Sequence, residues 1–243
     1  MNKHIVYLSL FDGISAGRLA MTRSLHHKKI PFTYYSSEID KNAMRITNHN
    51  FPDTIQLGDV RHLHKGMFPY EIGIVTGGSP CQNFSFAGKR KGMTTEELIE
   101  ILTLKQYLKL KEEGFQFKGE SYLFWEFVRM VDELKPKYFL LENVRMSKKW
   151  EDVISKALGV KPIKINSSTV SAQNRYRLYW TNIPDVLIPE DKEIQLSDLI
   201  PGAKGYGERG KWIPELRKCI GVSKTIRKDG KANCLVTTNS PTQ

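Results

Sequence analysis

Short apolar runs alternate with amphipathic stretches along the first half of this chain, and this alternation limits the possible folds more than any other feature. The pattern favours parallel strands joined by crossover helices. We therefore expect an α/β fold with a doubly wound, mostly parallel sheet. The 243 residues are enough for one large domain of this kind with a buried core, followed by a small appendage.

The same alternation places the individual elements. The expected strands are His4–Leu10, Phe32–Ser37, Glu71–Thr76, Tyr138–Leu141, Ile163–Ser168 and Tyr176–Asn182, with a shorter extended piece at Thr54–Leu57. The expected helices are Ala16–His27, Lys41–Asn50, Thr94–Glu113, Ser121–Leu134 and Trp150–Leu158. From about Pro184, prolines, glycines and lysines interrupt the pattern. We therefore expect one domain over residues 1–183 and a separate, loop-rich, basic segment over residues 184–243.

Composition limits the cellular location and the class of partner. The formal net charge of +11 suits a polyanionic partner, although a solvated basic surface explains it equally well. Three cysteines without C-x-x-C or H-x-x-x-H spacing indicate reduced thiols, no disulfide framework and no zinc site. No apolar run reaches the roughly 18 residues of a membrane span, and the first one is too short for a signal peptide. We expect a cytosolic protein.

Polar residues stand directly after the apolar runs, where the expected strands end. The first strand runs into Phe11–Gly13, the second into Glu38, the next long one into Gly77–Cys81 and the following one into Glu142. Ligands of doubly wound sheets bind beyond the carboxyl ends of the strands. These four segments are therefore expected to lie along one edge of the sheet and to form the site.

Three of the strand ends suit a nucleoside-bearing cofactor. The Phe11–Gly17 segment is a glycine-rich turn between a strand and a helix, yet the spacing of its glycines excludes a G-x-G-x-x-G fingerprint. A tight turn without a ligand is expected in about half of such loops. Glu38 could accept both hydroxyls of a ribose. Asp59 could accept a hydrogen bond from an adenine amino group, although a helix N-cap is the commoner role for such a residue.

Two further residues suit covalent chemistry on a pyrimidine. Carbon 5 of cytosine attacks a methyl sulfonium only after a nucleophile has added at carbon 6, and a thiolate suits that task. Cys81 follows Pro80, whose ring fixes φ and helps to hold the thiol at the sheet edge. Glu142 could protonate or hydrogen-bond N3 of the base. The alternatives are an inert core cysteine and a carboxylate that caps the next helix.

Arg175 and Arg177 stand two residues apart in an expected extended stretch, so both are expected to point to one face. Paired guanidinium groups can clamp a base carbonyl or a phosphate. Surface ion pairing is at least as common for two arginines on an edge strand.

Taken in order, these segments resemble the cytosine-5 DNA methyltransferase family. The matching pieces are Phe11–Gly13, Ser37–Glu38, Gly58–Val60, Gly77–Cys81, Tyr122–Phe127, Glu142–Val144 and Gln173–Arg177. They cover about the first 182 residues in family order. Ser9–Gly13 and Gly58–Arg61 are most similar to animal de novo members, and Pro80–Ser85 to bacterial and phage members.

The resemblance implies a Rossmann-like, S-adenosylmethionine-dependent enzyme that methylates cytosine in double-stranded DNA, as in bacterial restriction-modification, with the base flipped out of the duplex. It implies that Cys81 attacks carbon 6, that Glu142 acts at N3, and that Arg177 with Arg175 orients the cytosine. Phe11 would stack on the adenine, and the loop Gln82–Met93 would close over the DNA. The cofactor-binding residues implied are Phe11, Asp12, Gly13, Ile14, Ser15, Glu38, Ile39, Asp59, Val60, Pro80 and Leu123.

Two departures from the family pattern qualify these expectations. Thr94–Lys118 is longer than usual and indicates an added amphipathic helix of unassigned function. The target-recognition region, its organising segment and a final helix are not recognisable, and Gly221–Gln243 resembles at most the start of recognition machinery. We expect residues 184–243 to be an incomplete recognition region, with a second polypeptide supplying the rest or with the chain as a fragment. We therefore expect the chain alone to be weakly active or inactive on DNA.

Three other readings stay open at this point. The first is methylation of cytosine in transfer RNA, which some members of the family perform. The second is a catalytically silent partner that binds DNA or an active homologue, which the intact Cys81, Glu142 and Arg177 disfavour. The third, a nicotinamide dehydrogenase, is disfavoured by the missing glycine fingerprint.

Overall fold

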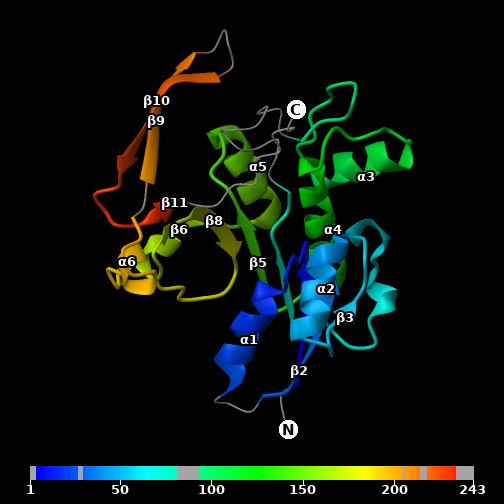
Figure 1. The fold of residues 1–243 in the computed structure, drawn as a ribbon. Helices are drawn as coiled ribbons and strands as arrows, with labels where there is room; N and C mark the ends of the chain where they lie inside the picture. The colour runs from blue at the N-terminus through cyan, green and yellow to red at the C-terminus, as the bar shows by residue number, and fades with distance from the viewer. Residues whose placement is uncertain (1–3, 27–29, 81–92, 205, 214–217, 234–243) are drawn as a thin grey trace. The chain divides into compact units, whose positions relative to one another are not determined.

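The computed structural model describes residues 4–26, 30–80, 93–204, 206–213 and 218–233 (Figure 1). The chain divides into two compact units. One comprises the residues up to Ile163 together with Leu178–Asp185, and the other comprises Lys164–Arg177 together with the residues from Val186 onward. Within the described residues, no helix has the length and apolar character needed to cross a membrane.

A seven-stranded sheet forms the centre of the fold, with strand order β3-β2-β1-β4-β5-β8-β6. Its strands are β1 (Ile5–Leu10), β2 (Phe32–Ser37), β3 (Ile55–Gln56), β4 (Ile74–Gly77), β5 (Tyr138–Asn143), β6 (Ile163–Asn166) and β8 (Tyr176–Thr181). The pairs from β3 through β5 are parallel, whereas β8 runs antiparallel to β5. The expected doubly wound, mostly parallel sheet is confirmed.

The helices that follow these strands are amphipathic, as a crossover helix must be. The α-helices are α1 (Ala16–His26), α2 (Lys41–Asn50), α3 (Leu104–Glu112), α4 (Phe124–Leu134), α5 (Lys148–Leu158) and α6 (Leu196–Leu199). Single 3-10 turns are η1 (Val60–His62), η2 (Lys65–Met67), η3 (Ser121–Leu123) and η4 (Ser167–Thr169). The helices α1 and α2 begin next to the strand-end turns of β1 and β2.

The core lies between the sheet and α4. Strand β1 is buried from Val6 to Leu10, and α4 buries Phe124–Val128 and Met130. A Cβ placed on Gly77 of β4 would lie only 2.8 Å from the Phe127 ring. Helix α4 therefore packs directly on the end of β4, at a distance that only glycine permits.

The expected helix over Thr94–Glu113 is wrong in its first ten residues. Thr94 forms an isolated bridge with Glu100, and Thr95 forms one with Phe117. The Thr95 amide also donates to the Ile99 carbonyl. Helix α3 starts only after Thr103, whose hydroxyl accepts from the Gln106 amide at 3.1 Å. The N-cap interaction and two buried β-branched residues outweigh the helical periodicity of the stretch.

The second unit is more regular than the sequence indicates. Strands β9 (Tyr206–Ile213) and β10 (Lys218–Ile226) pair antiparallel, with an irregularity between Ile220 and Ser223. Strand β11 (Ala232–Asn233) pairs parallel with β7 (Gln173–Asn174). The expectation of a loop-rich segment is wrong for β9 and β10, because the pairing partner of a strand is not visible in a local pattern.

Candidate functional site

The turn between β1 and α1 has a backbone shape that few sequences tolerate. Phe11, Gly13 and Ser15 have φ values of 56°, 59° and 60°. The Asp12 amide donates to the Ser37 carbonyl at 3.2 Å and so ties this turn to the end of β2. The left-handed backbone at two non-glycine residues needs such tertiary support, and strained backbone of this kind is concentrated at functional sites.

A buried polar network lies beneath the turn. The Asp12 carboxylate accepts from the Tyr34 hydroxyl at 2.7 Å and from the Ser15 hydroxyl, and Ser15 also contacts the Thr47 hydroxyl at 3.0 Å. Burial, followed by the charge of Asp12, raises the pKa of Tyr34 well above its usual value. Asp12 and Ser15 therefore shape the turn from below, so that other residues line the cavity.

Glu38 connects the turns that follow β1 and β2. One carboxylate oxygen accepts from the Gly13 amide at 2.7 Å, and the other accepts from the amides of Ile39 at 2.7 Å and Asp40 at 2.8 Å. Three backbone donors hold the carboxylate in one orientation. It is an oriented acceptor at the edge of the cavity.

Asp59 follows β3 and is engaged by its own neighbourhood. It caps η1 through the Arg61 amide at 2.9 Å, and the Arg61 guanidinium contacts both of its oxygens at 2.5–3.1 Å. The hydrogen bond from Arg61 holds the pKa of Asp59 below its usual value. The N-cap role that the sequence left open is therefore present in the structure, with an ion pair beside it.

These strand ends enclose a cavity of about 620 Å³. Its lining residues are Phe11, Ser37, Glu38, Ile39, Asp40, Gly58, Asp59, Val60, Arg61, Gly78, Pro80, Glu120, Tyr122 and Leu123. Seven of the expected cofactor residues are among them: Phe11, Glu38, Ile39, Asp59, Val60, Pro80 and Leu123. Of the other four, Asp12 and Ser15 belong to the network below, Gly13 donates to Glu38, and the Ile14 side chain is exposed.

The proposed acid lies against the turn that leads to the proposed nucleophile. Glu142 is half-buried near the end of β5, and a Cβ placed on Gly78 would be 3.3 Å from its Oε2 atom. The Asn143 side-chain amide donates to the Ser79 hydroxyl at 3.1 Å and to the Ser79 carbonyl at 3.3 Å. Both Asn143 and Ser79 are buried. The end of β5 therefore anchors the segment that enters Cys81.

Cys81 and the loop Gln82–Met93, apart from Met93 itself, lie outside the described residues. Arg175 and Arg177 belong to the second unit. The expected single extended stretch through both arginines is interrupted at Arg175, because β7 ends at Asn174 to pair with β11 whereas β8 starts at Tyr176. The two arginines therefore do not lie on one continuous strand, which was the basis for expecting their side chains on the same face.

Among the residues of this region that the sequence did not assign to the site are Arg61, Tyr122 and Asn143. Arg61 and Tyr122 line the cavity, and Asn143 anchors the Ser79 turn. Each is a direct neighbour of a residue that was identified, so adjacency was an available signal. What the sequence could not reveal was the direction of each side chain, which depends on the local turn.

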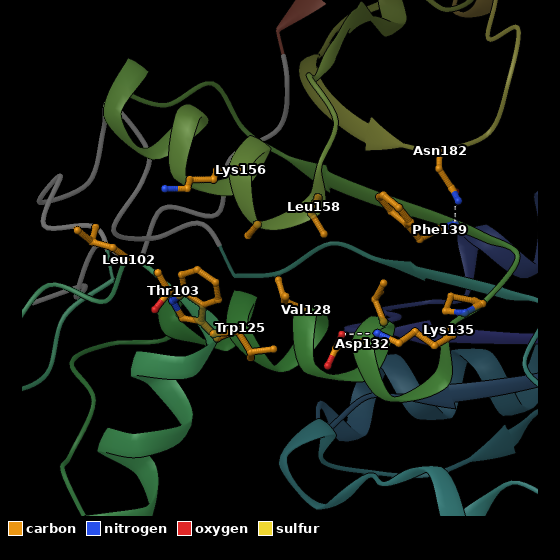
Figure 2. A pocket seen from close by; sticks show the side chains of 14 residues that line it. Leu102, Thr103, Trp125, Val128, Asp132, Lys135, Phe139, Lys156, Leu158 and Asn182 are labelled. Carbon is orange, nitrogen blue, oxygen red and sulfur yellow. Dashed lines mark hydrogen bonds and ion pairs between the residues drawn. The ribbon is translucent and has the colours of Figure 1, made fainter.

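A second cavity of about 500 Å³ lies between α4 and α5. Figure 2 shows Trp125, Val128 and Asp132 of α4 on one side, and Lys156 and Leu158 of α5 on the other. None of the expected site residues lines this cavity. The first cavity is therefore the candidate site, because the polar strand ends converge there.

Comparison with known proteins identifies the family. The family model described as C-5 cytosine-specific DNA methylase matches residues 5–104 and 110–158. The chain belongs to this family.

Individual relatives agree with the assignment. Type II methyltransferase M.BanI of Aneurinibacillus aneurinilyticus is 32% identical over 237 residues, which cover 93% of this chain and 48% of that protein. Orphan methyltransferase M.SPRI of Bacillus phage SPR is 29% identical over 199 residues, covering 76% of this chain and 39% of that protein. The chain thus spans less than half the length of these two relatives.

A solved structure shows likeness of the fold. Entamoeba histolytica methyltransferase EhMeth matches with a TM-score of 0.54 and 17% identity, over 81% of this chain and 59% of that one. The fold of this chain is therefore that of methyltransferase structures.

Proposed function

We propose that this chain transfers a methyl group from S-adenosylmethionine to carbon 5 of cytosine in DNA. One observation carries the proposal beyond family membership. The Glu142 carboxylate lies against Gly78, in the turn that enters Cys81, and Gly78 and Pro80 also line the strand-end cavity. The carboxyl group proposed as proton donor, the turn that leads to Cys81 and a ligand-sized cavity therefore lie at one edge of the sheet.

The cavity residues suit S-adenosylmethionine. A volume of about 620 Å³ is in the range of small-molecule sites. Phe11, Val60 and Leu123 would contact the flat adenine, and Asp59 its amino group. Glu38, held by three backbone amides, would accept the ribose hydroxyls. When bound, the cofactor supplies an electrophilic methyl group on a sulfonium.

In the proposed reaction, the Cys81 thiolate adds to carbon 6 of the base and forms a carbon–sulfur bond. Glu142 donates a proton or hydrogen bond to N3, which receives the displaced electron density. Carbon 5 thereby becomes nucleophilic and would take the methyl group from the sulfonium, which would leave as S-adenosylhomocysteine. The proton on carbon 5 is then lost to a base, the N3 proton returns to Glu142, and the Cys81 thiolate is expelled as the aromatic ring is restored.

Arg177, with Arg175, is proposed to hold the cytosine after it leaves the duplex. Flipping a base costs a few kcal/mol of unstacking, which contacts in the site must offset. The net charge of +11 supports a DNA substrate through counterion release. The proposed place of action is the cytoplasm of a bacterial or phage-infected cell.

Labelled methyl transfer to duplex DNA tests this function. The wild type is compared with Cys81→Ser, each alone and with a polypeptide that corresponds to the remaining length of a relative such as M.BanI. We expect transfer that depends on Cys81 and that increases when the second polypeptide is present. Equal transfer by Cys81→Ser would refute the mechanism, and strong sequence-specific transfer by the chain alone would refute the need for a partner.

Two substrates separate the alternatives. Transfer RNA offered in parallel reveals an RNA methyltransferase if label enters RNA and not DNA. A DNA duplex with 5-fluorocytosine at the target position would accumulate as a covalent complex, because fluorine on carbon 5 cannot leave as a proton does. A silent DNA-binding partner would form no such complex.

A further inference from the structure

Helix α3, to which the sequence assigns no function, contacts a charge buried in the core of the first unit. Glu126 of α4 has no exposed surface. One of its carboxylate oxygens accepts from the Tyr107 hydroxyl and from the Lys111 ammonium, both at 2.5 Å. Both donors belong to α3. A buried carboxylate without partners would be strongly destabilising, and α3 provides two of the three side chains that compensate it, Tyr107 and Lys111.

The third partner of Glu126 is Arg129, which connects it to the wall of the cofactor cavity. The second Glu126 oxygen accepts from Arg129 Nε at 2.6 Å. The same guanidinium donates to the Val60 carbonyl at 3.1 Å, to the Leu63 carbonyl at 2.9 Å and to Glu133 at 2.7 Å. Arg129 thus joins α4 to both ends of the turn that follows Asp59.

This turn forms a wall of the cavity. Val60 lines the cavity directly, and the turn is closed by bonds from the His62 amide to the Asp59 carbonyl and from the Leu63 amide to the Val60 carbonyl. Lys111 and Tyr107 do not line the cavity. A continuous chain of hydrogen bonds therefore runs from α3 to the cavity wall without α3 touching a ligand.

We propose that α3 is a positioning element of the cofactor site, which acts through Glu126 and Arg129 to hold the turn of residues 59–63. This inference rests on the proposed function, because it takes the cavity to be the cofactor site. The group has two carboxylates and two cations, so its charges balance. Without the Lys111 cation, Arg129 must satisfy the excess negative charge and is drawn away from the two carbonyls.

The test compares Lys111→Met with Lys109→Met. Both lysines lie on α3, but Lys109 forms an exposed ion pair with Glu113 and none with Glu126. Calorimetry with S-adenosylmethionine should show a dissociation constant raised about three- to tenfold in Lys111→Met. The value in Lys109→Met should match the wild type, and Lys111→Arg should restore binding because it keeps the cation.

A second readout tests the positioning without any ligand. Amide hydrogen exchange at His62 and Leu63 should be faster in Lys111→Met than in Lys109→Met, because the turn loses its hold. Tyr107→Phe, which retains the cation and the packing of the ring, should show the same change to a smaller extent. It replaces Lys111→Met in both measurements should that variant fail to fold.

The outcomes separate the two proposals. Unchanged dissociation constants and unchanged exchange in the α3 variants, with tight cofactor binding by the wild type, would overturn the inference and leave the proposed function standing. A folded wild type that binds no S-adenosylmethionine would refute the cofactor proposal. The exchange rates at His62 and Leu63 would then still decide whether α3 holds the turn.

Discussion

The strand-end cavity proposed for the cofactor and the residues proposed to handle the cytosine are built in different ways. The cavity residues follow consecutive parallel strands of one unit, and hydrogen bonds between neighbouring turns connect them, such as that from Gly13 to Glu38. The cytosine-handling residues come from distant parts of the chain. Glu142 lies in the first unit, Arg175 and Arg177 lie in the second, and Cys81 lies outside the described residues.

This difference indicates how cofactor binding could be separated from placement of the cytosine. A cavity formed within one unit needs only that unit to fold, so cofactor binding should be a property of the first unit. The proposed placement of the cytosine involves residues assigned to both units. Substitutions should therefore fall into two groups, those that abolish transfer while cofactor binding persists and those that weaken cofactor binding itself.

The largest effect is expected for Cys81→Ser. Methyl transfer should fall by at least about 10³-fold, because the hydroxyl is a far weaker nucleophile than the thiolate. The dissociation constant for S-adenosylmethionine should stay at the wild-type value. Single-turnover transfer and calorimetry check the two parts, with Cys219→Ser as the control. If Cys81→Ser lost cofactor binding while Cys219→Ser kept it, cofactor binding and methyl transfer would not be separable as proposed.

A smaller loss is expected for Glu142→Gln. Transfer should fall about a hundredfold or more, because the amide keeps the shape of the side chain but cannot deliver a proton to N3. The exposed Glu112→Gln on α3 serves as a control that should retain activity. Wild-type rates in Glu142→Gln would show that the carboxyl group has no role at the base.

Glu38→Ala should weaken cofactor binding, because Glu38 lines the strand-end cavity. Removing the carboxylate leaves three backbone amides without their charged acceptor and removes the proposed ribose contact. The dissociation constant for S-adenosylmethionine should rise about tenfold or more. Transfer at saturating cofactor should change much less. Glu71→Ala, just before β4 and hence at the opposite edge of the sheet, should bind cofactor as the wild type does.

The smallest effect concerns Asp59 and pH. Arg61 holds the pKa of Asp59 below its ordinary value of 3.8, so the carboxylate contributes stability above about that pH. The contribution is lost as the pH falls through the lower, folded-state pKa. Urea unfolding at acidic and neutral pH gives the change in the free energy of unfolding between the two conditions. This change should be smaller in Asp59→Asn than in the wild type, by less than about 1 kcal/mol. The exposed Asp132→Asn is the control, and equal acid sensitivity of Asp59→Asn and the wild type would contradict the assignment.

Much of the fold was accessible to local sequence reasoning. The strand Phe32–Ser37 and the helix Lys41–Asn50 have the predicted bounds, since a short apolar run and the Asp40 cap act within a few residues. The Thr94–Glu113 prediction was wrong because Thr103 caps a later start of the helix. For the site, the strand-end residues were identified, whereas the anchoring role of Asn143 depends on a contact with a residue 64 positions away.

The sequence by itself determined the α/β class, the succession of strands and helices along most of the first 183 residues, and the kinds of side chain at the strand ends. These depend on short-range periodicity and on turn chemistry, which a linear pattern records. Only the tertiary structure decided that β8 runs antiparallel beside β5, that Arg61 occupies the Asp59 carboxylate, and that α3 reaches the cavity wall through Glu126 and Arg129. These features depend on long-range packing and on the need to pair a buried charge, which local periodicity does not encode.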